Sequence, residues 1–199
     1  RPVDRRDNYI KRCVAIPGDT IQIVNGQVSI NGKPQKNFAG LQYNYYVKTN
    51  GTPLNPRVLS KYNISREHLN INYNPNYILP LTTKQVAELQ RDIREIVSIE
   101  KYVEKGYDPQ IFPYIENYGW NVDNYGPLWI PARTKTVNLD LDNLPLYRAI
   151  IENYEGNTVV IKDDIIFING EPVSGYTFKM DYYFMMGDNR HRSADSRFW

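Results

Sequence analysis

The stretch MMGDNRHRSADSRFW, at residues 185–199, is the most informative part of this chain. It gathers charged and polar residues into one turn-rich run, directly behind two segments that we predict to be strands, 176–179 and 182–186. Opposite charges lie close together in the run, so its aspartates and arginines can pair with each other or with partners elsewhere. Taken alone, the run is typical of a solvated surface loop with salt bridges.

A second stretch, NYIKRCVAIPGD at residues 8–19, changes that interpretation. It places Lys11 and Arg12 inside an otherwise apolar segment, 9–16, which we predict to be a strand ending in a Pro-Gly-Asp turn. Because side chains alternate along a strand, Lys11 and Arg12 point to opposite faces. Each of these two cations therefore needs its own environment.

Together the two stretches resemble type I signal peptidases, the membrane-anchored Ser/Lys proteases that remove signal peptides from exported proteins. That family carries a strand of the form Y-I-K-R-x-V-x-x-P-G-D and a later G-D-N-R-x-x-S-x-D-S-R-[YF]-W. Here the first reads Tyr9 to Asp19 and the second reads Gly187 to Trp199, in the same order. The resemblance is close over about residues 1–33 and 158–199, and between them it rests on architecture alone.

The resemblance implies that Lys11 is a general base and that Ser193 is the serine whose hydroxyl orients the lysine amine. A lysine base must be neutral at its working pH, and burial in apolar surroundings favours that form. Lys11 lies between Ile10 and the apolar run 13–16, which could bury it. Without the motif, a lone strand lysine usually extends to solvent, and Ser193 would be an ordinary turn residue.

The same resemblance assigns a scaffold around these two residues. Arg12 matches an arginine that pairs with the first aspartate of the second motif, here Asp188. Asp195 and Arg197 match a second internal pair. These four residues are expected to hold Ser193 against Lys11.

Two further positions match residues that line the substrate cleft of the family, Tyr9 and Ile10. Ile10 is expected to form a wall that limits the pocket to small, alanine-like side chains. Such a wall discriminates by steric exclusion.

In the family, the nucleophilic serine lies in an S-M-x-P-like segment upstream of the Lys-Arg strand. None of the ten residues that precede Lys11 is a serine, and no apolar run approaches the ~20 residues that span a bilayer. We therefore expect a fragment that lacks the N-terminal membrane anchor and the nucleophile and that is inactive by itself. The whole enzyme would act on signal peptides of exported pre-proteins at the outer face of the cytoplasmic membrane.

Composition narrows the classes of partner. Lysines and arginines number 24 against 22 acidic residues and form no run, so nucleic-acid binding is not predicted. The single cysteine, Cys13, excludes an internal disulfide, and we expect it to be buried as a small apolar residue. His68 and His191 belong to no ligand cluster, so no metal or cofactor is expected, and His191 is expected to be exposed.

The predicted fold is mainly β with a few helices (α+β), an antiparallel catalytic core interrupted by an inserted domain. The core comprises residues 1–34 and 158–199, and the insertion comprises 35–157, with helices near 83–105 and 143–155. A hairpin of strands 20–24 and 27–30 is predicted about Asn25-Gly26.

Another hairpin is predicted over 159–169, and SINGKP at 29–34 is echoed by FINGEP at 167–172. That echo is explained more simply by Asn-Gly marking the ends of hairpins than by a duplicated domain.

Three other interpretations compete with this one. A self-cleaving repressor-type domain uses the same Ser/Lys chemistry but lacks the long insertion and the Gly-Asp-Asn-Arg stretch. A non-catalytic β-rich interaction module and a diverged peptidase relative remain the alternatives from another functional class. A serine followed by proline, after an upstream apolar segment of the full gene, would favour the enzyme.

Overall fold

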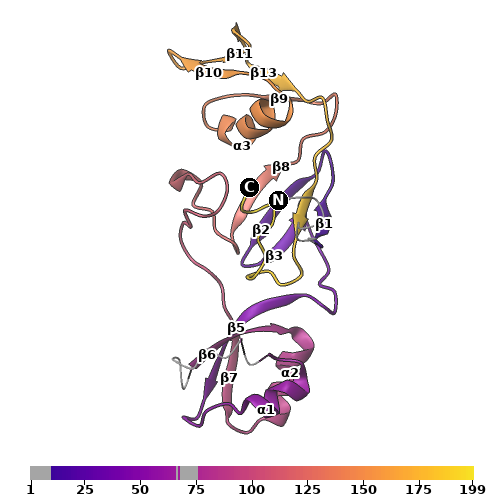
Figure 1. Ribbon diagram of the computed structural model, residues 1–199, viewed down its shortest axis with the longest axis vertical. Helices are drawn as coiled ribbons and strands as arrows, with labels where there is room; N and C mark the ends of the chain where they lie inside the picture. Colours follow the sequence, from indigo (N-terminus) through magenta and orange to yellow (C-terminus); the bar gives the residue numbers. More distant parts are fainter. Residues whose placement is uncertain (1–9, 66, 68–75) are drawn as a thin grey trace, which may run out of the picture. The chain divides into compact units, whose positions relative to one another are not determined.

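The computed structural model describes residues 10–65, 67 and 76–199 (Figure 1). Antiparallel sheets predominate in this part of the chain. The α-helices are short: α1 (Pro56–Leu59), α2 (Thr83–Asp92) and α3 (Leu144–Ala149). The predicted fold class, mainly β with a few helices, is therefore confirmed. Tyr9 lies outside the described residues.

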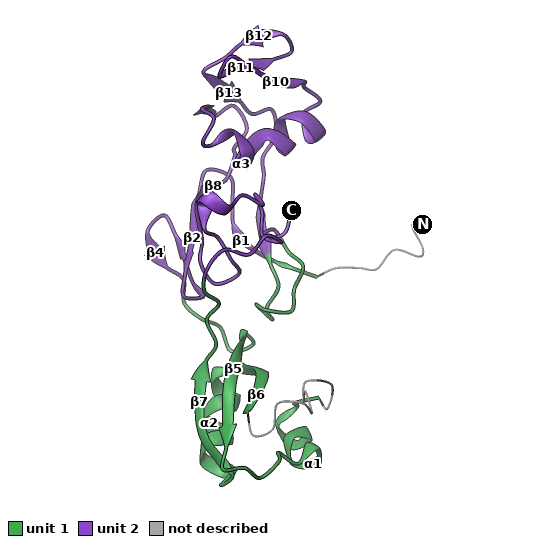
Figure 2. Ribbon diagram, turned by 90° about the vertical axis from the view of Figure 1, so that its left-hand side faces the viewer, with its two compact units in different colours: residues 1–12, 36–105, 186–195 green, residues 13–35, 106–185, 196–199 purple. Residues whose placement is uncertain are grey.

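The chain divides into two compact units, which Figure 2 distinguishes by colour. Unit 1 comprises Arg1–Arg12, Lys36–Lys105 and Met186–Asp195, and unit 2 comprises Cys13–Gln35, Gly106–Met185 and Ser196–Trp199. The segment Met186–Asp195, called the motif loop below, thus shares a unit with residues 36–105.

Unit 1 is built on a three-stranded antiparallel sheet. Its central strand is β5 (Gln42–Thr49), flanked by β6 (Asn76–Thr82) and β7 (Ile96–Lys101). Helix α2 packs beside this sheet, as Figure 1 shows. The core between them is formed by Val47, Leu79, Leu81, Leu89 and Ile99, with Leu54, Leu59, Ile64, Tyr77 and Ile93.

Helix α2 begins at a capping box. The Thr82 hydroxyl accepts from the Gln85 N–H at 3.2 Å, and the Gln85 side chain accepts from the Thr82 N–H at 2.8 Å. The predicted helix over 83–105 is wrong beyond Asp92, because Ile96–Lys101 forms strand β7 instead. Apolar residues at helical spacing suggested continuation, but the β-branched run starting at Ile96 pairs with β5.

Unit 2 contains the predicted hairpin with its predicted bounds, β2 (Thr20–Val24) and β3 (Gln27–Ile30). The turn residues Asn25 and Gly26 have φ values of 50° and 76°, as a two-residue turn of the mirror-image type requires. Strand β4 (Lys33–Pro34) extends the sheet beyond β3, and β8 (Tyr125–Trp129) pairs with the other edge of β2.

The similarity between SINGKP at 29–34 and FINGEP at 167–172 extends to the structure, because each segment belongs to a unit of three paired strands. Strands β10 (Val159–Lys162), β11 (Ile165–Ile168) and β12 (Glu171–Pro172) pair in the same order as β2, β3 and β4. The predicted hairpin over 159–169 is thereby confirmed.

Side-chain hydrogen bonds repeat as well. The Asn31 side-chain oxygen accepts from the Thr20 N–H at 2.8 Å, and the Asn169 side-chain oxygen accepts from the Thr158 N–H at 2.9 Å, eleven residues earlier in both copies. The amide group of each asparagine donates to the residue before that threonine, at 2.7 and 2.9 Å. The repeat therefore covers residues 19–35 and 157–173, well beyond the Asn-Gly turns themselves.

The remaining elements of unit 2 include a helix and a strand that are linked through the Glu155 carboxylate. Helix α3 continues into η6 (Ile150–Tyr154), in agreement with the helix predicted near 143–155, and β9 (Thr136–Asn138) pairs with β13 (Gly175–Thr177). Just after η6, the Glu155 carboxylate accepts from the hydroxyls of Tyr176 at 2.5 Å and Tyr182 at 3.1 Å. Burial, followed by the contact with Glu155, raises the pKa of Tyr176 to about 12.

Cys13 departs from its prediction, because it is exposed rather than buried. It lies on β1 (Arg12–Ala15), whose two-stranded sheet contains only β14 (Phe184–Met186) besides β1 among the described residues. So small a sheet leaves the Cys13 side of the strand uncovered.

The cap of α2 is expected to stabilise unit 1. Replacing Thr82 with alanine removes the acceptor for the Gln85 N–H and should lower the free energy of unfolding by about 1 kcal/mol. Urea denaturation followed by circular dichroism would measure the change. Thr83→Ala is the matched control, because Thr83 is exposed in the first turn. Equal effects of the two substitutions would contradict the role of the cap.

Tyr176 should make unit 2 sensitive to alkali. Its phenol loses a proton near pH 10 in the unfolded chain but only near pH 12 in the folded one, so the free energy of unfolding should fall across this window. Denaturation at several pH values would measure the slope. Tyr176→Phe should make the slope shallower, whereas Tyr183→Phe, at an exposed tyrosine, should not.

Candidate active site

Lys11 and Ser193 meet in unit 1 although 182 residues separate them in sequence. The Lys11 Nζ donates to the Ser193 Oγ at 2.7 Å. Ser193 is 8% exposed, and Lys11, directly before β1, is half-buried. A short contact between an amine and a buried hydroxyl is an arrangement in which proton transfer chemistry is possible.

Gly187 makes this contact possible by lacking a side chain. A Cβ atom at Gly187 would overlap the Cβ and Oγ of Ser193 and would lie 3.6 Å from the Lys11 Nζ. The Gly187 N–H donates to the carboxylate of Asp195, a fully buried residue, at 3.0 Å. The two ends of the motif loop are thus tied together around Ser193.

Arg12 and Asp188 form a bidentate pair, with both N–H···O distances at 3.0 Å. The Arg12 guanidinium also lies over the Phe38 ring, 3.9 Å from its centroid. The hydrogen bond to Asp188 raises the pKa of Arg12. Because both side chains are nearly half exposed, the pair contributes more to geometry than to stability.

Asp195 and Arg197, the other predicted scaffold residues, are both buried. Asp195 accepts from Gly187 as described, and Arg197, in unit 2, donates to the Val122 carbonyl at 3.0 Å. The pairing of Asp195 with Arg197 remains a prediction.

Ile10 lies at the edge of an open pocket in unit 1. The pocket has a volume of about 290 Å³ and is lined by Ile10, Lys11, Arg12 and Asp188. Ile10 itself is 93% exposed, so its side chain is available to contact another molecule. The apolar burial that we expected around Lys11 is incomplete here, because both Ile10 and Cys13 face solvent.

Backbone hydrogen bonds attach the motif loop to the sheet of unit 1. The Gln42 N–H donates to the Asp188 carbonyl at 2.9 Å, and the Arg190 N–H donates to the Gln42 carbonyl at 3.0 Å. Gln42 and Asn189 therefore form a parallel bridge. Only the folded chain brings these residues together, so no local pattern could have revealed the contact.

His191 adds a side-chain contact to this attachment. Its Nδ1 accepts from the Asn44 N–H at 3.1 Å, and its ring lies edge-on to Tyr43 and Tyr102. The expectation that His191 is exposed is therefore wrong, because β5 and the residue after β7 cover its ring and leave it half-buried.

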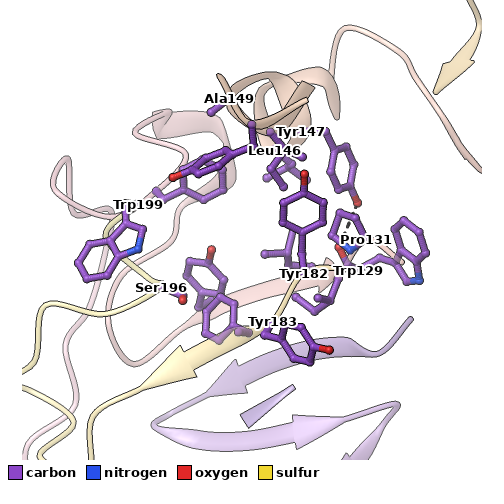
Figure 3. A pocket seen from close by; sticks show the side chains of 16 residues that line it. Trp129, Pro131, Leu146, Tyr147, Ala149, Tyr182, Tyr183, Ser196 and Trp199 are labelled. Atoms are coloured by element: carbon purple, nitrogen blue, oxygen red, sulfur yellow. Dashed lines mark hydrogen bonds between the residues drawn. The ribbon is translucent and has the colours of Figure 1, made fainter. Parts of the chain in front are cut away.

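A second cavity of about 290 Å³ lies in unit 2 (Figure 3). Its lining is mostly aromatic and aliphatic, and Figure 3 shows Tyr147, Tyr182, Trp129 and Trp199 among the side chains around it. No lysine or histidine is among the described residues that line it. Its chemistry suits an apolar group rather than proton transfer.

Two other features bear on the class of protein. Within the described ranges, no three histidine, cysteine, aspartate or glutamate side chains are grouped so that they could hold a metal ion. None of the helices in those ranges is both long and apolar enough to cross a membrane.

The role of Gly187 can be tested by adding one methyl group. Gly187→Ala should force Ser193 away from Lys11 and lower the free energy of unfolding by about 1–3 kcal/mol through overpacking. Thermal unfolding and the NMR signals of the Lys11 side chain would report the two effects. Gly40→Ala is the control, because a Cβ there meets no atom within 4 Å. An unchanged Lys11 environment in Gly187→Ala would contradict the close approach.

Comparison with known proteins agrees with the first motif. Residues 1–93 match the model of the family described as signal peptidase, peptidase S26. No curated protein and no solved structure matches the chain. The matched range contains Lys11 and Arg12, whereas the motif loop with Ser193 lies outside it and carries its resemblance by its own residues. The family match over residues 1–93 confirms that this chain resembles the type I signal peptidases.

Proposed function

We propose that this chain is part of a membrane-associated serine endopeptidase that removes signal peptides from exported pre-proteins by means of a Ser/Lys dyad. The observation that carries the proposal is the 2.7 Å contact between Lys11 Nζ and Ser193 Oγ. It joins a residue directly before β1, inside the peptidase-matched range, to a loop that carries the second motif of the resemblance.

In this mechanism Lys11 is the general base. Its neutral amine takes the proton of the nucleophilic serine as that oxygen bonds to the scissile carbonyl carbon, and it returns the proton to the leaving amine as the C–N bond breaks. Water then attacks the acyl carbon while Lys11 accepts its proton, and Lys11 returns that proton to the serine oxygen as the ester C–O bond breaks. Because no serine precedes Lys11 in this chain, the nucleophile is proposed to lie in a segment upstream of Arg1.

Ser193 orients the amine in this scheme. A hydroxyl accepts from an ammonium group and donates to a neutral amine, so it can stay bonded to Lys11 through both protonation states. A carboxylate at this position would hold the lysine charged instead. Gly187, the Arg12–Asp188 pair and Asp195 keep the loop and the strand in place.

The substrate side chain is proposed to enter the pocket lined by Ile10, Lys11 and Arg12. The exposed Ile10 side chain would set its size limit and favour small residues next to the scissile bond. Catalysis is proposed to take place at the outer face of the cytoplasmic membrane. The chain alone is proposed to be inactive.

The proposal is tested with the protein extended at its N-terminus by its native upstream sequence, using a pre-protein as substrate. Lys11→Ala should reduce the cleavage rate at least about a hundredfold, as expected for loss of a general base. Ser193→Ala should reduce it less. Lys48→Ala, at an exposed lysine of β5, should leave it unchanged.

Undiminished cleavage by Lys11→Ala would place the base elsewhere and contradict the proposal. Lys11-dependent cleavage by residues 1–199 alone would contradict the upstream nucleophile. A wild-type protein that folds and cuts no pre-protein would favour the non-catalytic alternatives.

A further inference from the structure

Strand β5 is longer than its neighbour β7 at one end. The last residue of β7 in register with β5 is Lys101, opposite Tyr45. The Tyr102 N–H still donates to the Asn44 carbonyl at 2.9 Å, and beyond that point β7 no longer follows β5. Because alternate residues of a strand direct their backbone groups to the same edge, Gln42 and Asn44 both face the side that β7 has left.

The motif loop pairs with the part of the β5 edge that β7 leaves uncovered. Gln42 donates to Asp188 and accepts from Arg190, so the loop runs beside β5 as a short parallel segment. The next donor of the edge is the Asn44 N–H, and here the partner is the His191 Nδ1 at 3.1 Å. An imidazole nitrogen thus stands where a neighbouring strand would present a carbonyl oxygen.

The ring of His191 is held in this role by its neighbours. Tyr43 and Tyr102 approach it edge-on, with centroid distances of 6.2 and 5.8 Å. Tyr43 is itself fixed by the Lys101 ammonium, which lies 3.7 Å from its centroid. To accept from Asn44, the imidazole must carry no proton on Nδ1.

We propose that His191 is a positioning residue that fastens the motif loop to β5 and thereby holds Ser193, two residues further on, at hydrogen-bonding distance from Lys11. This inference rests on the proposed function for its catalytic meaning, but the coupling itself is structural. The sheet of β5, β6 and β7 would then contribute directly to the catalytic site, because the segment that contains Ser193 is bonded along the edge of β5.

Two substitutions distinguish the effect of the His191 acceptor atom from that of its aromatic ring. His191→Phe keeps an aromatic ring against Tyr43 and Tyr102 but removes the acceptor, whereas His191→Asn restores an acceptor oxygen close to the position of Nδ1. Arg192→Ala is the control, because Arg192 is an exposed neighbour in the same loop.

The first readout is hydrogen exchange at the Asn44 amide, followed by NMR in this chain. His191→Phe should raise the exchange rate about tenfold, as expected for loss of one protected hydrogen bond. It should also shift the Nζ signal of Lys11. His191→Asn should restore both values toward those of the wild type, and Arg192→Ala should change neither.

The second readout is cleavage by the N-terminally extended protein. His191→Phe should lower kcat with little change in KM, because Ile10, which is proposed to set the size limit of the pocket, lies outside the motif loop, and His191→Asn should recover part of the loss. A wild type that cleaves nothing would remove the proposed function, while the NMR results would still decide the coupling.

Unchanged exchange at Asn44 in His191→Phe would overturn the inference. Faster exchange with an unchanged Lys11 signal would also overturn it, because His191 would then fasten the loop without positioning Ser193.

Discussion

The hydrogen bond from Lys11 to Ser193 depends on two segments that have no reason to meet in the unfolded chain. Closing a loop over 182 positions of the chain costs conformational entropy, and one hydrogen bond contributes only about 1 kcal/mol to the free energy of folding. The contact therefore exists because other interactions bring the segments together. Gly187 leaves room for the hydroxyl, Asp195 ties the two ends of the loop, and Arg12 clamps the adjoining strand to Asp188.

The geometry of the site is set more by backbone pairing than by its charged side chains. The Arg12–Asp188 pair is half exposed and is screened by water. In contrast, the bonds between Gln42 and the motif loop follow the hydrogen-bonding directions of a sheet that packs on α2. A well-packed sheet deforms little, so a segment that is hydrogen-bonded along its edge is held in a defined position. His191 completes that edge with a side chain.

What the residue pattern itself predicted was local, whereas long-range contacts could be predicted only through the family resemblance. The Asn25-Gly26 turn specified the hairpin of β2 and β3 residue by residue, because few residues other than Asn and Gly adopt positive φ values readily. The resemblance predicted Lys11 and Ser193 as partners, and the two side chains are in hydrogen-bonding contact. The end of α2 was mispredicted because a helical spacing of apolar residues ran on into β7, where pairing with β5 decided the outcome.

The errors over Cys13 and His191 have the same origin. The exposure of each is decided by how much of a neighbouring strand covers it, and that depends on distant parts of the chain. The partners of Gln42 and Asn44 were unpredictable for this reason as well.

The repeated three-stranded unit has a consequence for how this chain accommodates change. Each copy satisfies its turns with its own asparagine, threonine and preceding residue, so neither copy relies on the other for those hydrogen bonds. Their surroundings nevertheless differ, since β2 has β8 on its outer edge while Arg148 donates to the Val159 carbonyl of β10. The same set of internal hydrogen bonds therefore serves in two different surroundings, and a change between the copies that spares β8 and Arg148 leaves both sets intact.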